Sequence, residues 1–147
     1  YPHKAKVTAA GIDDASFLAE LYPGMTYVRA DATALPFADR AFDIVHSSAV
    51  IEHVGAAANQ ARMIAECARV CRLGFFITTP NRWFPIELHT RLPLVHWLPD
   101  GAAGRAYDLA GRGWARENHL LGSSDLRGLF PGPVRVVNLG LPLVAIT

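Results

Sequence analysis

Polar side chains follow each of four short apolar runs in this 147-residue chain. The runs and the residues that follow them are 7–12 with Asp13, 25–29 with Asp31, 42–46 with Ser47 and Ser48, and 75–79 with Asn81. A carboxylate can accept hydrogen bonds from both hydroxyls of a ribose. A carboxylate beside a backbone N–H, as at Asp31 and Ala32, can bind the edge of an adenine. The pattern predicts a nucleoside-binding site.

Each of these residues alone also has a structural explanation. Asp13 or Asp14 could cap the helix that follows, because Asp is a favoured N-cap residue and a helix dipole stabilises a nearby anion. Asp31 could be an ordinary turn residue, and the serines could cap a short helix through Val54. Their joint placement at successive strand ends favours a shared site.

The elements that must position these residues alternate between strand and helix patterns. Between 59 and 73 one apolar face recurs at helical spacing, formed by Met63, Ile64, Cys67, Val70 and Cys71. Gly74 is expected to end this helix. Further helices are expected at 15–21 and 123–129. The apolar runs are too continuous for strands with one wet face, so they predict an α/β fold with a mostly parallel sheet and helices on both faces.

The C-terminal half is less regular. Residues 81–113 are rich in Trp, Pro and Gly and show no clear period. Strands are expected at 134–139 and 143–146, separated by Pro142, and they could form a closing antiparallel hairpin. We expect one domain over 1–147, with 81–122 as an insert that covers a substrate.

Composition limits the classes of partner. Fourteen Lys and Arg residues nearly balance thirteen Asp and Glu residues, so nucleic acid is not an expected partner. Cys67 and Cys71 form neither a disulfide framework nor a zinc motif. No run is long enough for a membrane span, and no signal peptide is visible, so a cytoplasmic location is expected.

Three linked stretches carry a family resemblance. They are "VTAAGIDD", "YVRADATALPFADRAFDIVHSSAVIEHV" and "CRLGFFITTPN". Together they resemble the body of a class I S-adenosylmethionine-dependent methyltransferase (methyltransferase type 11-like), which has a D-A-x-x-L-P-F turn and an F-D-x-V strand. The resemblance covers about residues 7–82 and implies a Rossmann-like sheet.

The resemblance also implies roles for single residues. Asp13 would hold the ribose hydroxyls of S-adenosylmethionine, and Asp31 with Ala32 would contact its adenine. Ser47 and Ser48 would lie near the methionine part of the cofactor. The remaining part of the pattern, Glu52 and His53, matches the family's E-H pair.

The family's first strand, its glycine-rich loop and the following helix have no counterpart here. Only six residues precede Val7, and the glycine pairs at 101–104 and 111–113 follow no strand. We expect a first strand and helix of roughly 30 residues to be missing. In the family that strand lies between those ending at Asp13 and Ser47. The gap could close directly, or another chain could complete the sheet as a homo-oligomer.

In the resemblance, the insert would cover the methyl acceptor. Asn81, Trp83, His89 and Trp97 are the expected substrate-binding residues around a small apolar acceptor. The same residues could instead form a hydrophobic lid or a dimer surface. His53 and His89 are the candidate catalytic bases, with His46 a further choice.

A metal is not expected, because His89 and His96 could share a helical face but no third ligand is in register.

Three functions remain open from the sequence. The first is methyl transfer from S-adenosylmethionine, impaired if the missing loop is needed. The second is a non-catalytic, degenerate Rossmann-like module that acts as a partner subunit. The third is a nicotinamide dehydrogenase. That class needs a G-x-G-x-x-G turn and a catalytic Tyr and Lys pair, and this sequence shows neither.

Overall fold

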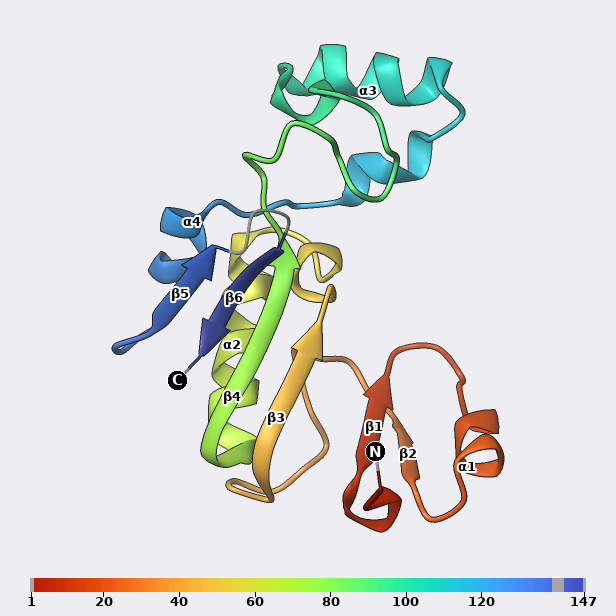
Figure 1. The fold of residues 1–147 in the computed structure, drawn as a ribbon, viewed down its shortest axis with the longest axis vertical. Coiled ribbons are helices and arrows are strands. Elements are labelled where there is room, and N and C mark those ends of the chain that lie inside the picture. The colour runs from red at the N-terminus through yellow and green to blue at the C-terminus, as the bar shows by residue number, and fades with distance from the viewer. Residues whose placement is uncertain (1, 139–141, 147) are drawn as a thin grey trace.

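A computed structural model describes residues 2–138 and 142–146 (Figure 1). Its strands and longer helices are β1 (Thr8–Gly11), α1 (Phe17–Leu21), β2 (Thr26–Arg29), β3 (Phe42–Ser48), α2 (Ala57–Val70), β4 (Cys71–Pro80), α3 (Asp100–Leu109), α4 (Ser123–Gly128), β5 (Arg135–Asn138) and β6 (Pro142–Ile146). Short 3-10 helices are η1 (Lys4–Lys6), η2 (Ile51–His53), η3 (Val95–Trp97) and η4 (Gly113–Glu117). The order of elements is that of an α/β fold.

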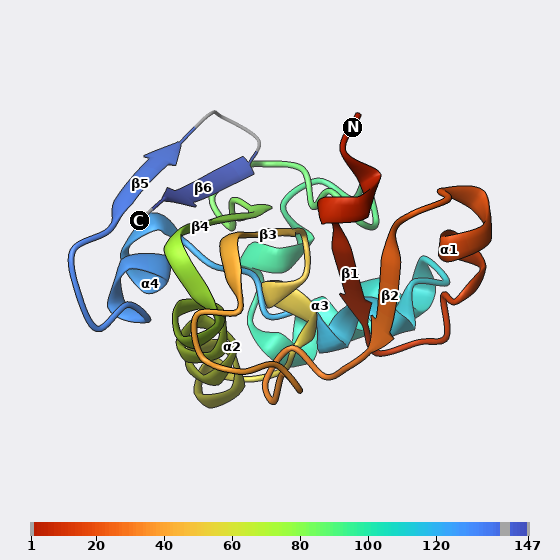
Figure 2. The ribbon, with the colours of Figure 1, turned by 90° about the horizontal axis from the view of Figure 1, so that it is seen from below.

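The strands form two sheets. β1 and β2 pair in parallel, and the second sheet has the order β3-β4-β6-β5. β3 and β4 are parallel, whereas β6 runs antiparallel to both β4 and β5. The parallel strands and the closing hairpin of the sequence prediction are therefore confirmed, although Leu139 lies outside the described residues. Figure 2 shows β1 beside β3, and no ladder joins these two strands in the described part of the chain.

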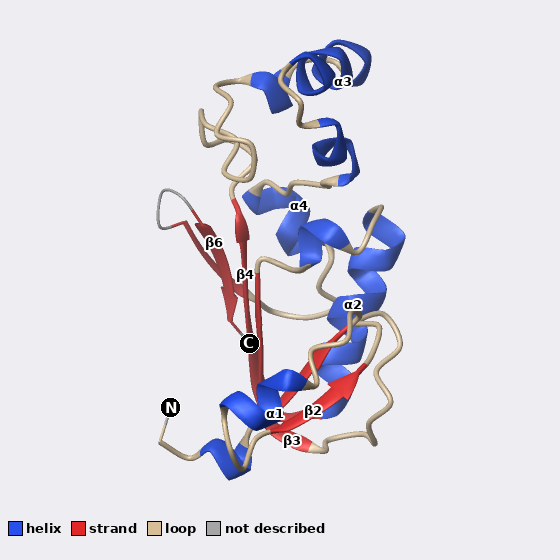
Figure 3. Ribbon diagram, turned by 90° about the vertical axis from the view of Figure 1, so that its right-hand side faces the viewer, coloured by secondary structure: helices blue, strands red, loops and turns tan. Residues whose placement is uncertain are grey.

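The main core lies between α2 and the larger sheet. Met63, Ile64 and Cys67 recur at helical spacing and are buried together with Ile77 of β4 and Leu126 of α4. Burying one such aliphatic side chain contributes roughly 1.5–3 kcal/mol. Both α2 and α4 lie on the same face of the larger sheet (Figure 3). This packing holds the carboxyl ends of β3 and β4 in fixed positions.

The N-terminal unit, defined as β1, α1 and β2, packs differently. From residue 2 to residue 30 no side chain is buried. Phe17 and Leu21 of α1 are 57% and 60% exposed. A hydroxyl of Tyr27 on β2 donates to the carbonyl oxygen of Gly11 on β1 at 3.1 Å. Backbone pairing and a few such bonds hold this unit together.

The insert forms a second small core above the sheet (Figure 1). Val95, Ala103, Tyr107 and Ala115 are buried together and belong to η3, α3 and η4. The sequence prediction of irregular structure missed α3, whose two glycines are poor helix formers. That 81–122 acts as a lid stays a prediction.

Gly74 does not end α2 as predicted. The helix ends at Val70, and Cys71 already has the extended backbone that begins β4. Gly74 lies inside β4, paired with Ile44 of β3. The apolar position at Cys71 fits a strand as well as a helix, so periodicity alone could not place this boundary. Within 2–138 and 142–146 the structure has no helix of the length and apolar character that crossing a membrane requires.

Candidate functional site

The strand register brings Asp13 and Asp31 to matching positions. Gly11 of β1 pairs with Arg29 of β2, so each aspartate lies two residues beyond the last paired residue of its strand. The Arg29 Nε also donates to the carbonyl oxygen of Ile12 at 2.8 Å. The two carboxylates therefore end neighbouring parallel strands, as the sequence predicts.

Of the two aspartates before α1, Asp14 is the one that hydrogen-bonds the turn into the helix. Asp14 accepts a hydrogen bond from the Ser16 backbone N–H at 3.0 Å, and this bond lowers the pKa of its carboxyl group. Among the described residues, no hydrogen bond involves the carboxylate of Asp13. Asp13 is therefore free for a ligand, and Asp14 stabilises the turn into α1.

Asp31 stabilises its own turn. Its Oδ1 accepts hydrogen bonds from the backbone N–H and the hydroxyl of Thr33, both at 2.8 Å. These bonds lower the pKa of the Asp31 carboxyl group, the backbone bond most. The turn fixes the carboxylate and the adjacent Ala32 in one orientation.

The ends of β3 and β4 hold paired hydroxyl groups. Ser48 accepts a hydrogen bond from Thr78 at 2.9 Å. The hydroxyl oxygen of Ser47 is shielded from solvent and has no hydrogen-bond partner in the described part of the chain. An unpaired buried hydroxyl carries a desolvation cost of about 1–3 kcal/mol. It is therefore suited to pair with a polar ligand.

Glu52 lies deeper, directly after this strand end. It is fully buried on η2, where its Oε2 accepts a hydrogen bond from the Thr79 hydroxyl at 2.9 Å. Its Oε1 has no hydrogen-bond partner. This oxygen lies 3.6 Å from His89 Nε2 and 3.9 Å from His53 Nε2. The two candidate bases therefore converge on one buried carboxylate, with their rings 4.9 Å apart.

Glu87, a polar residue of the insert to which the sequence assigned no role, orients His89. Its Oε1 lies 2.8 Å from His89 Nδ1, and it also accepts hydrogen bonds from the backbone N–H groups of His89 and Thr90. Burial alone would raise the pKa of Glu87, but hydrogen bonds from Thr90 and His89 outweigh it and lower that pKa. The carboxylate is therefore charged at neutral pH. The sequence carried no signal for this contact, because Glu87 and His89 lie in a segment with no regular period.

The aromatic residues of the insert gather around Arg82. The carbonyl oxygen of Arg82 accepts a hydrogen bond from Trp97 Nε1 at 2.8 Å and lies 2.9 Å from His96 Nε2. The rings of Trp83 and Trp97 are 6.4 Å apart. His96 is thus held by backbone carbonyls of the insert. The suggested sharing of one helical face by His89 and His96 is wrong, because His89 lies in a turn and only His96 lies in a helix.

Asn81 also has a structural role. Its side-chain oxygen accepts a hydrogen bond from the Trp83 N–H at 3.0 Å.

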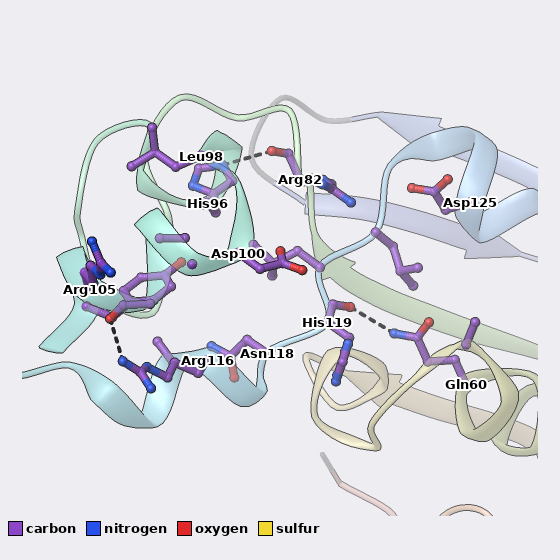
Figure 4. Close-up of a pocket in the computed structure, with 18 of the residues that line it drawn as sticks. Gln60, Arg82, His96, Leu98, Asp100, Arg105, Arg116, Asn118, His119 and Asp125 are labelled. Atoms are coloured by element: carbon purple, nitrogen blue, oxygen red, sulfur yellow. Dashed lines mark hydrogen bonds between the residues drawn. The ribbon is translucent and has the colours of Figure 1, made fainter.

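A cavity of about 900 Å³ opens between the insert and α2 (Figure 4). Its polar lining includes Gln60, Arg82, Asp100, Arg105 and His119. Gln60 Nε2 donates to the carbonyl oxygen of His119 at 2.9 Å. The predicted residues Asn81, Trp83, His89 and Trp97 do not line this cavity.

The cavity lies instead beside their sequence neighbours, since Arg82, His96 and Leu98 line it. Their side chains could not be chosen from sequence because the backbone of the insert has no regular period from which to infer direction.

The strand-end residues fit a polar, nucleoside-like cofactor in part. Asp13 has a free carboxylate, Asp31 is fixed beside Ala32, and Ser47 has an unpaired buried hydroxyl. Asp13 and Asp31 end adjacent strands, whereas Ser47 ends a strand that is not paired with them. The structure thus brings together the first two but not all three through backbone pairing.

Comparisons with known proteins identify a family and a shared fold. A family described as "Methyltransferase domain" matches residues 4–78, which are 75 of the 147 residues. No curated protein matches the chain.

Solved structures share the fold at low sequence identity. An S-adenosylmethionine-dependent methyltransferase from Methanosarcina mazei is 18% identical with a TM-score of 0.61, over 97% of this chain and 82% of that one. Another from Thermotoga maritima is 12% identical with a TM-score of 0.59, over 96% and 81% of the two chains. A third from Aquifex aeolicus is 12% identical with a TM-score of 0.54, over 95% and 66%.

Proposed function

This chain belongs to the methyltransferase domain family, and on that premise we propose that it transfers a methyl group from S-adenosylmethionine to a small acceptor with an apolar body. One observation supports the proposal most. Asp13 and Asp31 occupy matching positions past the paired ends of adjacent parallel strands, which is where α/β proteins bind nucleotides.

The cofactor would be held by groups from three strand ends. The free carboxylate of Asp13 would accept hydrogen bonds from the ribose, and Asp31 with Ala32 would bind the adenine. The unpaired hydroxyl of Ser47 and the neighbouring Ser48 would contact the methionine part. When bound, S-adenosylmethionine supplies a methyl group on a sulfonium centre.

The acceptor would lie under the insert. The cavity joins polar groups such as Arg82 and His119 to the apolar side chains of Leu98 and Leu121. A molecule with an apolar body and one polar group matches this lining. Trp83 and Trp97, both partly exposed, would cover the acceptor at its edge.

The protein's part in the reaction would be alignment and proton removal. Alignment of two reacting groups can supply most of the rate increase in a displacement reaction. His89 is the better-oriented base, since Glu87 accepts from its Nδ1 and leaves the Nε2 lone pair free, and an acceptor would have to extend beyond the cavity lining to reach it. His53 is the alternative base, because its ring is more exposed and lies beside the same Glu52.

The sheet would need one more strand for full cofactor binding. β1 and β3 are not paired with each other in the described residues, so each presents backbone N–H and C=O groups along one edge. A strand from another segment or from a second copy of the chain would satisfy them. This is also how a homo-oligomer would form, and its mass would be measured by light scattering during gel filtration.

Calorimetric titration of the chain with S-adenosylmethionine tests the proposal. We expect binding, and a loss of at least about tenfold in affinity for Asp13→Asn, because a ribose bond to a charged acceptor is lost. Asp14→Asn is the matched control, since Asp14 already caps a turn, and its affinity should stay unchanged. Equal losses in both variants would contradict the assignment of Asp13.

The unpaired edges of β1 and β3 also favour a second candidate, a non-catalytic partner module. It predicts that the chain binds neither S-adenosylmethionine nor NAD. Binding of NAD alone would instead indicate a dehydrogenase.

A further inference from the structure

Two hydrogen-bond acceptors face each other at Glu52 and His89. Glu87 accepts from His89 Nδ1 at 2.8 Å, which assigns the proton to that nitrogen and leaves a lone pair on Nε2. That lone pair lies 3.6 Å from Glu52 Oε1, which is buried and has no hydrogen-bond partner. Two lone pairs at this distance repel unless a cation lies between them.

A proton does not fit this gap well. An N–H···O bond is about 2.7–3.2 Å long, so 3.6 Å exceeds its normal range. A metal with bonds of about 2.1 Å in tetrahedral geometry separates its ligand atoms by about 3.4 Å. The Glu52 to His89 distance of 3.6 Å and the Glu52 to His53 distance of 3.9 Å are both close to this value.

A third ligand completes the set. One ligand atom each from Glu52, His53 and His89 lies within 4.8 Å of the others. His53 is half exposed whereas Glu52 is fully buried, so solvent reaches the cluster at His53. Two imidazoles and a carboxylate leave an open coordination position, which is the arrangement of catalytic zinc sites.

The surrounding groups also match a metal site. Metal-binding histidines usually donate their second ring N–H to a carboxylate, and Glu87 accepts from His89 in this way. The second oxygen of the ligating Glu52 is itself held by the Thr79 hydroxyl at 2.9 Å. Glu87 and Thr79 therefore hold His89 and Glu52 in place before any metal binds.

We propose that Glu52, His53 and His89 bind one divalent transition-metal ion of the zinc class. Imidazole ligands favour Zn²⁺ or Co²⁺ over Mg²⁺, which prefers oxygen ligands and keeps several waters. The proposal does not rest on methyl transfer. A metal and a proton compete for the same lone pair of His89, so the metal-loaded protein could not use His89 as a base.

The test is calorimetric titration of the untagged full chain with Zn²⁺, and with Mg²⁺ as a background. Absorption spectra with Co²⁺ report the geometry of the site. We expect one equivalent of Zn²⁺ to bind, no heat from Mg²⁺, and visible Co²⁺ bands typical of four coordination. S-adenosylmethionine titrated into the same samples separates this proposal from the proposed function, because either ligand can bind without the other.

Variants locate the site. His53→Asn and His89→Asn should each weaken Zn²⁺ binding by more than about tenfold, and Glu87→Gln by about 10–100-fold, because a neutral amide replaces the carboxylate that accepts from His89. His46→Asn is the matched control, since it removes an exposed imidazole outside the cluster. Cys71→Ser is a second control, which tests whether the Cys71 thiolate binds the added Zn²⁺. Both controls should bind Zn²⁺ as the unchanged chain does.

Two outcomes would overturn the proposal. In the first, Zn²⁺ gives no more heat than Mg²⁺, which would mean that the cluster holds only an ion pair. In the second, Zn²⁺ affinity falls as much in His46→Asn or Cys71→Ser as in His53→Asn. Thermal unfolding of each variant verifies that it folds, and the partly exposed His53 provides a variant that does not disturb the core.

Discussion

The N-terminal unit and the first part of the body of the molecule match the same family in sequence, over residues 4–78, but the two regions differ in burial. The body comprises β3 to β6 with α2 and α4, and its centre is fully buried at Ile64, Ile77 and Leu126. In the N-terminal unit no side chain is buried, and Leu21 is 60% exposed. A family pattern therefore specifies strands and turns in both regions, but stability depends on packing partners that only the body has.

The largest expected effect comes from the same substitution, Leu to Ala, made once in each region. Leu126→Ala should lower the free energy of unfolding by about 3 kcal/mol, because a fully buried side chain leaves a cavity. Leu21→Ala should cost at most about 0.5 kcal/mol, since its side chain is mostly in water already. Urea unfolding followed by circular dichroism measures both. Similar costs would show that the N-terminal unit packs against something in solution.

A second test concerns the buried carboxylate of Glu87. Its pKa is lowered by folding from an ordinary value of 4.5, so its contribution to stability is complete above that pH and is lost as the pH falls through the lowered value. Glu87→Gln should destabilise the chain by about 2 kcal/mol at pH 7 and by less at pH 3.

Urea midpoints of both proteins from pH 3 to 7 measure this effect. A constant difference across that range would contradict it. In the N-terminal unit, Asp14→Asn is the matched control, because its carboxylate is exposed and should alter stability far less.

Glycine substitutions make a smaller contrast. A Cβ at Gly122 would lie 2.7 Å from Trp83 Nε1, so Gly122→Ala must displace the indole and should cost about 1 kcal/mol. At Gly11 the nearest atom is the Tyr27 hydroxyl at 3.4 Å, an ordinary contact. Gly11→Ala should therefore be nearly neutral. Melting temperatures and Trp fluorescence of the two variants separate these results, and an unchanged Trp signal in Gly122→Ala would refute the first.

The smallest expected effect involves the loop that joins the two regions. Arg69 of α2 donates to the carbonyl oxygens of Leu35 and Phe37 and pairs with Glu66 and Asp39. Arg69→Ala should speed hydrogen exchange at 35–39 and leave the amides of the body core unchanged. Arg62→Ala is the control, because Arg62 makes one long contact at 3.5 Å. Faster exchange throughout α2 would show that Arg69 supports the body as a whole.

Much of the fold could be predicted because its signals are local. The runs that became β1, β2 and β3 are apolar, short and bounded by turn residues, and α2 shows its buried face at helical spacing. The predicted helix end at Gly74 was wrong because the apolar Cys71 fits the helical period and the strand period equally well. α3 was missed because Gly101 and Gly104 lower helix propensity. The buried Ala103 and Tyr107 stabilise this helix only through tertiary packing.

The site could be predicted only where it depends on strand ends. Asp13, Asp31 and Ser47 follow runs that the pattern identifies, so their positions could be expected from sequence. The contact of His89 with Glu52 joins segments 37 positions apart in the chain through an aperiodic insert. Its geometry follows from tertiary packing, which no local pattern encodes.

The separate apolar cluster of the insert has a consequence for evolution. Val95, Ala103, Tyr107 and Ala115 pack with one another and not with the Ile64 and Ile77 core. Substitutions inside this cluster leave the packing of Ile64 and Ile77 intact, so these four positions can diverge while β3 and β4 stay constant. Because Ala103, Tyr107 and Ala115 also line the cavity, such changes would reshape the cavity and leave the sheet beneath it in place.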